Sequence, residues 1–477
     1  MGVSQFFESK IIENFRHEPT ADQRALFGKL AEFVNGNQCN IMIIGGYAGT
    51  GKTSSMAAFI KTLRQFQHRY VLLAPTGRAA KVLSSFTGES AFTIHKRIYR
   101  QQSFAGGIGK FNLDINKTRD TFFIVDEASL ITINGSGGNN IFGSGDLLED
   151  FMTYIRSGAG NKVIFVGDRG QLPPIGMDES PALDVDFMQS AYGDVLTADL
   201  SDVVRQASES GILKNATIIR NAISKCPDGV HLSDLHLDIS EFQDIESIKG
   251  GDLIESLSSS IDKYGLDNMV VLCRSNKRAN RYNAGIRGTV LNREEQLNRG
   301  DKLMVVKNCY QFLEKVDDEN FFIANGDVSE LMKISKYEER YGLHFAKATL
   351  RFADYDDLEI TAKIILDTLT SESAALSDSQ QNMWFEGVSA DCEDVKNKKA
   401  SYRLIREDKS FNALQIKYAA SITCHKSQGG QWPCVYIDNP FWQEDLSRED
   451  LKWLYTAITR GMEKVLLVNF NDKLFDN

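Results

Sequence analysis

The hydrophobic residues in the first part of the chain are concentrated in short runs that are almost wholly apolar. These runs lie at 40–44, 70–74, 121–125 and 162–166, and each ends where a polar loop begins. A helical pattern of apolar residues over 20–35 precedes the first run. Strands that are apolar on both faces are typical of a parallel sheet covered by helices. The pattern therefore predicts an α/β domain whose ligands bind at the carboxyl ends of its strands.

A second series of apolar runs begins at 268–273 and resumes at 434–437 and 464–468. Between about 296 and 412 the pattern of apolar and polar residues differs. Short β-type runs there are followed by a polar stretch from 367 to 401. We interpret this region as a small β-rich insertion within a second α/β domain.

The length of 477 residues exceeds what one hydrophobic core usually organises, which also favours several domains. We expect the first α/β domain to cover residues 1–196. The second is expected to comprise 197–295 and 413–477, with the insertion at 296–412 between its two parts.

The composition, with 42% hydrophobic and 25% charged residues, is that of an ordinary soluble globular protein. Without an apolar run near the roughly 20 residues that span a bilayer, we expect no membrane association. The seven cysteines are scattered without a CxxC pair, which indicates a reducing compartment and argues against structural zinc. We expect a cytoplasmic protein, in a bacterium or a phage-infected host.

The formal net charge of −10 argues against a protein that merely coats nucleic acid. It does not exclude a motor, because a motor must release its track in every cycle and a local basic groove suffices on an acidic body. Net charge therefore leaves this question open.

The segment Gly46–Thr53 fits the pattern G-x-x-x-x-G-K-[ST], with an apolar strand before it and a helix-forming stretch after it. Backbone N–H groups of such a loop wrap phosphates, Lys52 would reach the β- and γ-phosphates, and Thr53 would ligate Mg²⁺. ATP and Mg²⁺ are the predicted cofactors, and the alternative is a chance match in a glycine turn. The expected nucleotide-binding residues here are Gly46, Tyr47, Ala48, Gly49, Thr50, Gly51, Lys52, Thr53 and Ser54.

Polar residues with possible catalytic roles follow two later strands. Asp126 and Glu127 end the run at 121–125, where the first can hold Mg²⁺ and the second can polarise the attacking water. Gln171, after the run at 162–166, is placed to sense the γ-phosphate. Without the glycine loop upstream, a solvated loop pair would be the better explanation of Asp126 and Glu127, and Gln171 would lie in an unremarkable turn.

Two arginines, Arg205 and Arg460, lie outside the first α/β domain. Hydrolysis at a domain interface needs positive charge on the γ-phosphate, and arginine is its usual donor. On spacing alone, an ordinary surface or salt-bridge arginine is the better explanation for both.

The ordered set of motifs resembles the superfamily 1 helicases of the RecD-like and phage Dda-like branch. Runs such as APTGRAAK, GDRGQLPP and TCHKSQG are together very specific, and the set extends over about 20–461. The matching segments are 20–23, 46–53, 74–81, 92–95, 125–128, 167–174, 203–206, 421–429 and 455–461.

The resemblance implies two RecA-like P-loop motor domains, each with a parallel sheet flanked by helices, that hydrolyse ATP in the cleft between them. Closure would bring Arg205 and Arg460 onto the γ-phosphate, and Gln23 would read the adenine. Each cycle would move single-stranded DNA across both domains in the 5′ to 3′ direction and displace the complementary strand.

The residues that the resemblance implies in strand contacts are Pro75, Thr76, Thr93, His95, Thr423 and His425. Hydroxyls and amides at strand ends grip phosphates without reading sequence, and rings stack on bases. Satisfied loop histidines are the alternative for the two imidazoles. The expected partners are single-stranded and forked DNA, with single-strand-binding or replisome proteins, for a monomeric motor in replication, recombination or repair.

The family also has a β-hairpin pin that splits the duplex and an SH3-like barrel that guides the strand. Residues 99–120 occupy the place of the pin, with Phe104 and Phe111 as candidate tip aromatics unless they pack in a core. The insertion at 296–412 would be the barrel, and 323–327 resembles its first turn. Two other hypotheses stay open: an RNA helicase or a translocase without strand separation, and a non-catalytic nucleic-acid-binding subunit.

Overall fold

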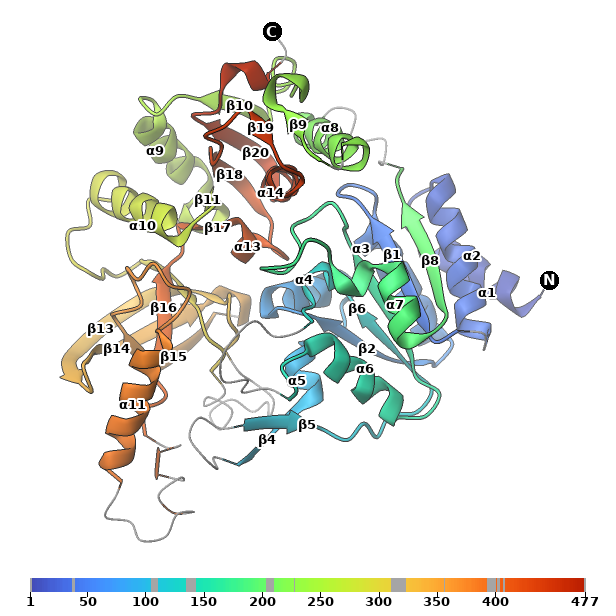
Figure 1. Cartoon of the computed structure of the whole chain (residues 1–477), viewed down its shortest axis with the longest axis horizontal. Helices are drawn as coiled ribbons and strands as arrows, with labels where there is room; N and C mark the ends of the chain where they lie inside the picture. The colour runs from blue at the N-terminus through green and yellow to red at the C-terminus, as the bar shows by residue number, and fades with distance from the viewer. Residues whose placement is uncertain are drawn as a thin grey trace.

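The chain folds into two α/β units, with a β-barrel beside the second (Figure 1). The computed structural model describes residues 2–36, 39–103, 110–133, 143–202, 210–226, 228–309, 323–355, 357–392, 400, 404–405 and 408–475. Among these residues, no helix has both the length and the apolar character needed to cross a membrane.

The first unit is built on a six-stranded sheet in the order β3-β2-β6-β7-β1-β8, with every pair of neighbours parallel. The strands are β1 (Ile41–Gly46), β2 (Arg69–Ala74), β3 (Ala91–Thr93), β6 (Thr121–Val125), β7 (Lys162–Gly167) and β8 (Val195–Leu200). The four expected apolar runs are β1, β2, β6 and β7, which confirms the parallel α/β prediction. β8 pairs with β1, so the boundary expected at 196 is wrong and the first unit extends to Leu200.

Helices cover both faces of the first sheet because its strands are apolar on both sides. Alternate residues of β1 illustrate this: Met42 and Ile44 face one core, and Ile41 and Ile43 face the other. The helices on the first face are α1 (Val3–Asn14), α2 (Ala21–Asn35), α3 (Lys52–Gln65) and α4 (Gly77–Thr87). Those on the second face are α5 (Ile94–Ile98), α6 (Leu147–Ser157) and α7 (Val185–Tyr192).

The second unit contains a five-stranded parallel sheet in the order β10-β20-β18-β11-β17. Its strands are β10 (Ile245–Ile248), β11 (Met269–Cys273), β17 (Ser421–Thr423), β18 (Trp432–Asp438) and β20 (Gly461–Val468). Its helices are α8 (Gly211–Lys225), α9 (Leu253–Tyr264), α10 (Asn276–Gly285), α13 (Cys424–Ser427) and α14 (Arg448–Ile458). A two-stranded ladder of β9 (Val230–His231) and β19 (Asp445–Leu446) lies at its edge. The three expected runs are β11, β18 and β20, which confirms the second α/β unit.

The insertion is a closed five-stranded barrel with a largely aliphatic core. Its strands are β12 (Lys302–Val305), β13 (Val328–Arg340), β14 (Leu343–Phe352), β15 (Leu358–Ile365) and β16 (Leu414–Tyr418). β16 pairs with both β12 and β15 and so closes the barrel. The expected end of the insertion at 412 is therefore wrong, because β16 is fully buried like the central strands of the α/β sheets and yet is the last strand of the barrel.

Two smaller features project from the body of the molecule in Figure 1. An antiparallel hairpin of β4 (Tyr99–Ser103) and β5 (Lys110–Leu113) lies within the expected segment 99–120. Helix α11 (Asp378–Ala390) extends away from the barrel and packs Trp384 against Phe345 of β14. Residue 104 and the side chain of Phe111, the two candidate tip aromatics, lie outside the described residues.

The barrel is anchored to the first unit by an ion pair whose carboxylate is buried. Lys81 of α4 lies 3.3 Å from the carboxylate of Asp327, whose side chain is fully buried, and 3.3 Å from the centre of the Tyr355 ring. Asp327 also accepts hydrogen bonds from the Tyr355 hydroxyl and the Ala324 amide. Burial raises the pKa of Asp327, and Lys81 opposes that rise. Because a buried carboxylate without its cation is costly, this pair fixes where the barrel sits.

We expect the substitution Lys81→Ala to lower the free energy of unfolding by about 1–3 kcal/mol, less than a fully buried pair would because Lys81 is partly hydrated. The shift of the urea midpoint measures this loss. The exposed pair of Arg64 and Glu89 provides the control, since Arg64→Ala should leave the urea midpoint close to that of the wild type. Equal effects of the two substitutions would contradict the anchoring role.

Candidate nucleotide and nucleic-acid site

The glycine loop joins the end of β1 to the start of α3. Gly49 and Gly51 adopt positive φ angles of 78° and 79°, a backbone region that favours glycine. The amino group of Lys52 donates hydrogen bonds to the carbonyls of Gly46 and Tyr47, at 2.6 and 2.8 Å. Thr53 and Ser54 follow in the first turn of α3 and are half-buried. The loop thus presents backbone amides and a helix amino terminus, which together suit an anion such as a phosphate.

Gln23 lies against this loop although it is distant in the sequence. It belongs to the capping box that starts α2, in which its side chain accepts from the amide of Thr20. Its side-chain amide also donates to the carbonyl of Thr50 at 3.0 Å, and the residue is buried. The structure therefore brings Gln23 and the glycine loop together, and a role in reading adenine remains a proposal.

The acidic pair lies at the carboxyl end of β6, two strands from β1 in the sheet. Burial, with the neighbouring charge of Glu127, raises the pKa of Asp126 to about 6, and Lys52 opposes the rise. The Asp126 side chain accepts a hydrogen bond from the amide of Glu127 at 2.9 Å. Glu127 has a φ of 51°, which is uncommon for a residue other than glycine and typical of strained functional positions.

The donors in this region suit magnesium. Among the described residues, no three histidine, cysteine or acidic side chains gather in a metal-binding group. Mg²⁺ does not require one, since it is usually held by one or two carboxylates together with substrate phosphates and water. A cation would also relieve the repulsion between Asp126 and Glu127. The hydroxyl of Thr53 and the carboxylate of Asp126 are the residues that would hold it.

The loop after β7 contacts the second unit directly. The carboxylate of Asp168, which is 1% exposed, accepts the amide of Gly170 at 2.9 Å and the hydroxyl of Tyr455 at 2.7 Å. Gln171 is buried, and its side-chain oxygen has no hydrogen-bond partner among the described residues. An unpartnered buried acceptor in the loop that follows β7 is consistent with a group that acts on a ligand or its water.

Further hydrogen bonds join the same loop to the second unit. Leu172 donates its amide to the hydroxyl of Thr456 at 2.9 Å, and its carbonyl accepts from Gln428 at 2.8 Å. Lys452 of α14, itself buried, pairs with Glu179 at 2.8 Å. The candidate nucleotide site is thus bordered by both α/β units.

Arg460 is buried within the second unit in this structure. Its guanidinium donates to the carbonyls of Thr456 and Gly430 and to the hydroxyl of Thr459, at 3.1–3.2 Å. It would have to exchange these partners to reach a phosphate. The other expected arginine, Arg205, lies outside the described residues.

The residues expected to contact a nucleic-acid strand lie at the carboxyl ends of strands. Pro75 and Thr76 follow β2, Thr93 ends β3, and Thr423 ends β17. Thr76 and Thr93 accept hydrogen bonds from the helices that they cap, α4 and α5, at 3.2 Å. In the second unit, a Cβ at Gly429 would lie 3.4 Å from the hydroxyl of Thr76. The two units therefore meet beside this set of threonines.

The two histidines of the set are neutral near neutral pH. Burial lowers the pKa of His95 to about 4, and burial also lowers the pKa of His425. The His95 ring lies 5.7 Å from that of Tyr99 and is tilted by 45° to it, and the Tyr99 hydroxyl donates a hydrogen bond to Asp150. Such imidazoles can stack or hydrogen-bond, but they do not supply positive charge to a phosphate backbone.

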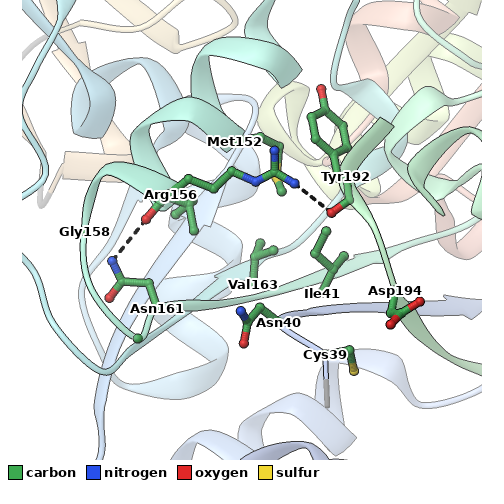
Figure 2. A pocket seen from close by; sticks show the side chains of 12 residues that line it. Cys39, Asn40, Ile41, Met152, Arg156, Gly158, Asn161, Val163, Tyr192 and Asp194 are labelled. Atoms are coloured by element: carbon green, nitrogen blue, oxygen red, sulfur yellow. Dashed lines mark hydrogen bonds between the residues drawn. The ribbon is translucent and has the colours of Figure 1, made fainter. Parts of the chain in front are cut away.

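A cavity of about 310 Å³ lies at the amino-terminal ends of the strands of the first sheet, opposite to the ends that carry the glycine loop (Figure 2). It is lined at the amino-terminal ends of β1 and β7 by Ile41 and Val163, and by Arg156 and Tyr192. The Arg156 guanidinium donates to the carbonyl of Tyr192 at 2.7 Å and so is already engaged. Because the glycine loop follows the other end of β1, this cavity is separate from the candidate nucleotide site.

Sequence reasoning did not assign a role to Tyr455, Thr456, Gln428, Lys81 or Asp327. Each of the first three lies inside or beside a matched motif, which was the signal available for them. Their partners are hundreds of residues away, so no local pattern could reveal the contacts.

Comparison with protein families places two segments of the chain. A model of the AAA domain family matches residues 19–225, and a model of the UvrD-like helicase C-terminal domain matches residues 418–468. These segments contain the glycine loop and Arg460, respectively.

The curated relatives are distant. An uncharacterised protein of Methanocaldococcus jannaschii is 22% identical over 94% of this chain, which spans 38% of that protein. An uncharacterised protein of Acanthamoeba polyphaga mimivirus is 24% identical over 93% of this chain and 98% of its own length. The ATP-dependent RecD2 DNA helicase of Deinococcus radiodurans is 29% identical over 37% of this chain and 21% of its own length.

Among solved structures, Pif1 helicase from Bacteroides in complex with ADP-AlF3 and ssDNA has a TM-score of 0.49 at 15% identity. The match covers 97% of this chain and 95% of that one. Pif1 helicase from Candida albicans has a TM-score of 0.44 at 16% identity, with 96% of each chain covered.

Proposed function

The chain belongs to the superfamily 1 helicases of the RecD-like branch, and from that premise we propose that it unwinds DNA by moving 5′ to 3′ on a single strand. As a helicase of this family it is an ATP-dependent enzyme. The direction, the preference for DNA and the role of Mg²⁺ are parts of the proposal.

The strongest support for this proposal is that the glycine loop and the loop after β7 both form hydrogen bonds with α14 of the second unit. A phosphate bound at the glycine loop would lie beside that interface. Loss of the γ-phosphate would therefore change contacts between two large bodies, which is what a motor requires.

The placement of the threonines supports the idea that this motion acts on a strand. Thr76 and Thr93 belong to the first unit and Thr423 to the second, and all lie at carboxyl ends of parallel strands. Hydroxyls there can bind phosphates without reading bases. If each unit holds the strand in turn, relative motion of the units moves it.

We assign the chemistry to residues of both units. Lys52 would hold the β- and γ-phosphates, Thr53 and Asp126 the Mg²⁺, and Glu127 would orient the attacking water. Bound Mg²⁺ would neutralise phosphate charge. Arg460, once it leaves its carbonyl partners, would stabilise charge on the γ-phosphate together with Arg205 and Gln171.

We also propose that the β4–β5 hairpin separates the duplex and that the barrel guides the strand. The hairpin projects from the first unit, and the barrel is held to α4 by Lys81 and Asp327. Thr76, which we propose contacts the DNA strand, caps the amino terminus of α4. The barrel is therefore attached close to the proposed path of the DNA strand.

The decisive test is unwinding of matched forks that carry a single-stranded tail at either the 5′ or the 3′ end. We expect at least about tenfold faster strand displacement from the 5′-tailed substrate, because the motor loads on the strand along which it moves. Displacement of the 3′-tailed substrate alone would refute the direction. An RNA-tailed substrate in a parallel reaction separates DNA from RNA specificity, and translocation without displacement would refute unwinding.

A further inference from the structure

The hydroxyl of Tyr455 joins both α/β units at the candidate nucleotide site. Tyr455 lies on α14 of the second unit and is 1% exposed. Its oxygen accepts a hydrogen bond from the backbone amide of Ala48 at 2.9 Å and donates one to Asp168 at 2.7 Å. Ala48 is in the glycine loop and Asp168 follows β7, so one atom of the second unit binds two separate loops of the first.

The surroundings of the Tyr455 hydroxyl keep it protonated, so that it acts as a hydrogen-bond donor to Asp168. Burial, followed by the nearby charge of Asp168, raises the pKa of Tyr455 well above its usual value, so the phenol keeps its proton and donates it. A Cβ at Gly170 would lie 3.1 Å from the Tyr455 ring, so the loop is closely packed against it. The other oxygen of Asp168 is occupied by the Gly170 amide.

The hydroxyl is therefore sensitive to two events. Movement of α14 away from the glycine loop would break both hydrogen bonds, so that one oxygen of the buried Asp168 carboxylate and the half-buried amide of Ala48 would lose these partners, which is unfavourable. A nucleotide that binds the amides of the glycine loop would compete with Tyr455 for the amide of Ala48. Either event changes the free energy of the other, and such coupling acts in both directions.

We propose that Tyr455 is a positioning residue that couples nucleotide binding at the glycine loop to the placement of the second motor unit, through Ala48 and Asp168. This inference rests on the proposed function and deepens it. Tyr455 differs from Arg460 in acting through the protein backbone and a carboxylate rather than on the phosphate itself.

The test is the effect of nucleotide on strand affinity. The Kd for a fluorescent single-stranded DNA is measured by anisotropy with and without a non-hydrolysable ATP analogue. The ratio of the two constants reports the coupling in the wild-type protein. In Tyr455→Phe we expect the two constants to differ by about tenfold less than in the wild type, so that the ratio lies closer to one. A tenfold effect is a typical size for coupling between two sites. The kcat of ATP hydrolysis should fall, whereas the KM should not rise, because the nucleotide no longer competes with the hydroxyl for the Ala48 amide.

Tyr436→Phe is the matched control, because it removes the same atom from a buried tyrosine elsewhere in the second unit. The Tyr436 hydroxyl lies 2.8 Å from those of Ser256 and Ser260, on the face of the sheet away from α14. Its loss should lower stability similarly and leave the ratio at the wild-type value. A general structural effect would change the ratio of the two constants equally in Tyr455→Phe and Tyr436→Phe.

Asp168→Asn alters the same hydrogen bond from the side of the first unit. It replaces Tyr455→Phe in the test if that variant does not fold. It should reproduce the loss of coupling, and the double variant should be no worse than either single one. A wild-type ratio of one, an unchanged ratio in Tyr455→Phe, or an equal loss in Tyr436→Phe would overturn the inference. Absence of DNA-stimulated ATP hydrolysis in the wild type would instead refute the proposed function.

Discussion

Replacing Lys52 with alanine should reduce DNA-stimulated ATP hydrolysis by about 10³-fold and abolish unwinding. The lysine is the only part of the glycine loop that would place a full positive charge on the β- and γ-phosphates. Its amino group bonds the carbonyls of Gly46 and Tyr47 in the structure, next to the amides that would receive those phosphates. Phosphate release and strand displacement on a 5′-tailed fork measure the two losses.

The loop itself should survive this substitution. The Thr50 hydroxyl bonds the carbonyl of Tyr47 at 2.8 Å, and Gln23 holds the carbonyl of Thr50, so loop geometry does not depend on the lysine alone. Lys61→Ala, an exposed position on the same helix, is the control and should leave hydrolysis unchanged. Retention of more than a tenth of the wild-type rate in Lys52→Ala would contradict the assignment of the site.

Replacing Arg460 with lysine should also lower kcat by about 10³-fold, because an arginine that stabilises the γ-phosphate commonly contributes 10³–10⁵. Lysine keeps the charge but loses the planar fork that can engage two phosphate oxygens. Nucleotide affinity should change little, since the guanidinium bonds carbonyls of its own unit in this structure. Steady-state hydrolysis, with nucleotide binding followed by fluorescence, separates the two effects.

Arg281→Lys serves as the reference, since Arg281 is an exposed arginine of the same unit. It should hydrolyse ATP like the wild type. If Arg460→Lys lost nucleotide affinity and kept its kcat, the arginine would be a ground-state binding group and the assigned role would be wrong.

The central strands of both sheets were predictable from the sequence, and the edge strands were not. The runs that became β1, β2, β6 and β7, and later β11, β18 and β20, are apolar on both faces because helices cover both sides. The strands that were not predicted, β3, β8, β10 and β17, lie at the edges of the two sheets. Edge strands are short or partly exposed, so the apolar signal is weak there.

Strand pairing explains the two boundary errors. β8 has a mixed pattern of burial and joins the first sheet only through pairing with β1. β16 is fully buried, like a motor strand, and its place in the barrel is set by pairing with β12 and β15. Strand pairing is a property of distant segments, and a local pattern does not contain it.

For the site, the sequence by itself determined the local devices: the glycine loop with its positive φ angles, the capping box of Thr20 and Gln23, and the acidic pair after a buried strand. These follow from neighbours along the chain. Only the tertiary structure decided what meets across the two units. Tyr455 and Ala48 are 407 positions apart, and Lys81 and Asp327 are 246 apart. Such contacts depend on how whole units pack, because a buried hydroxyl or carboxylate takes whichever partner the packing brings to it.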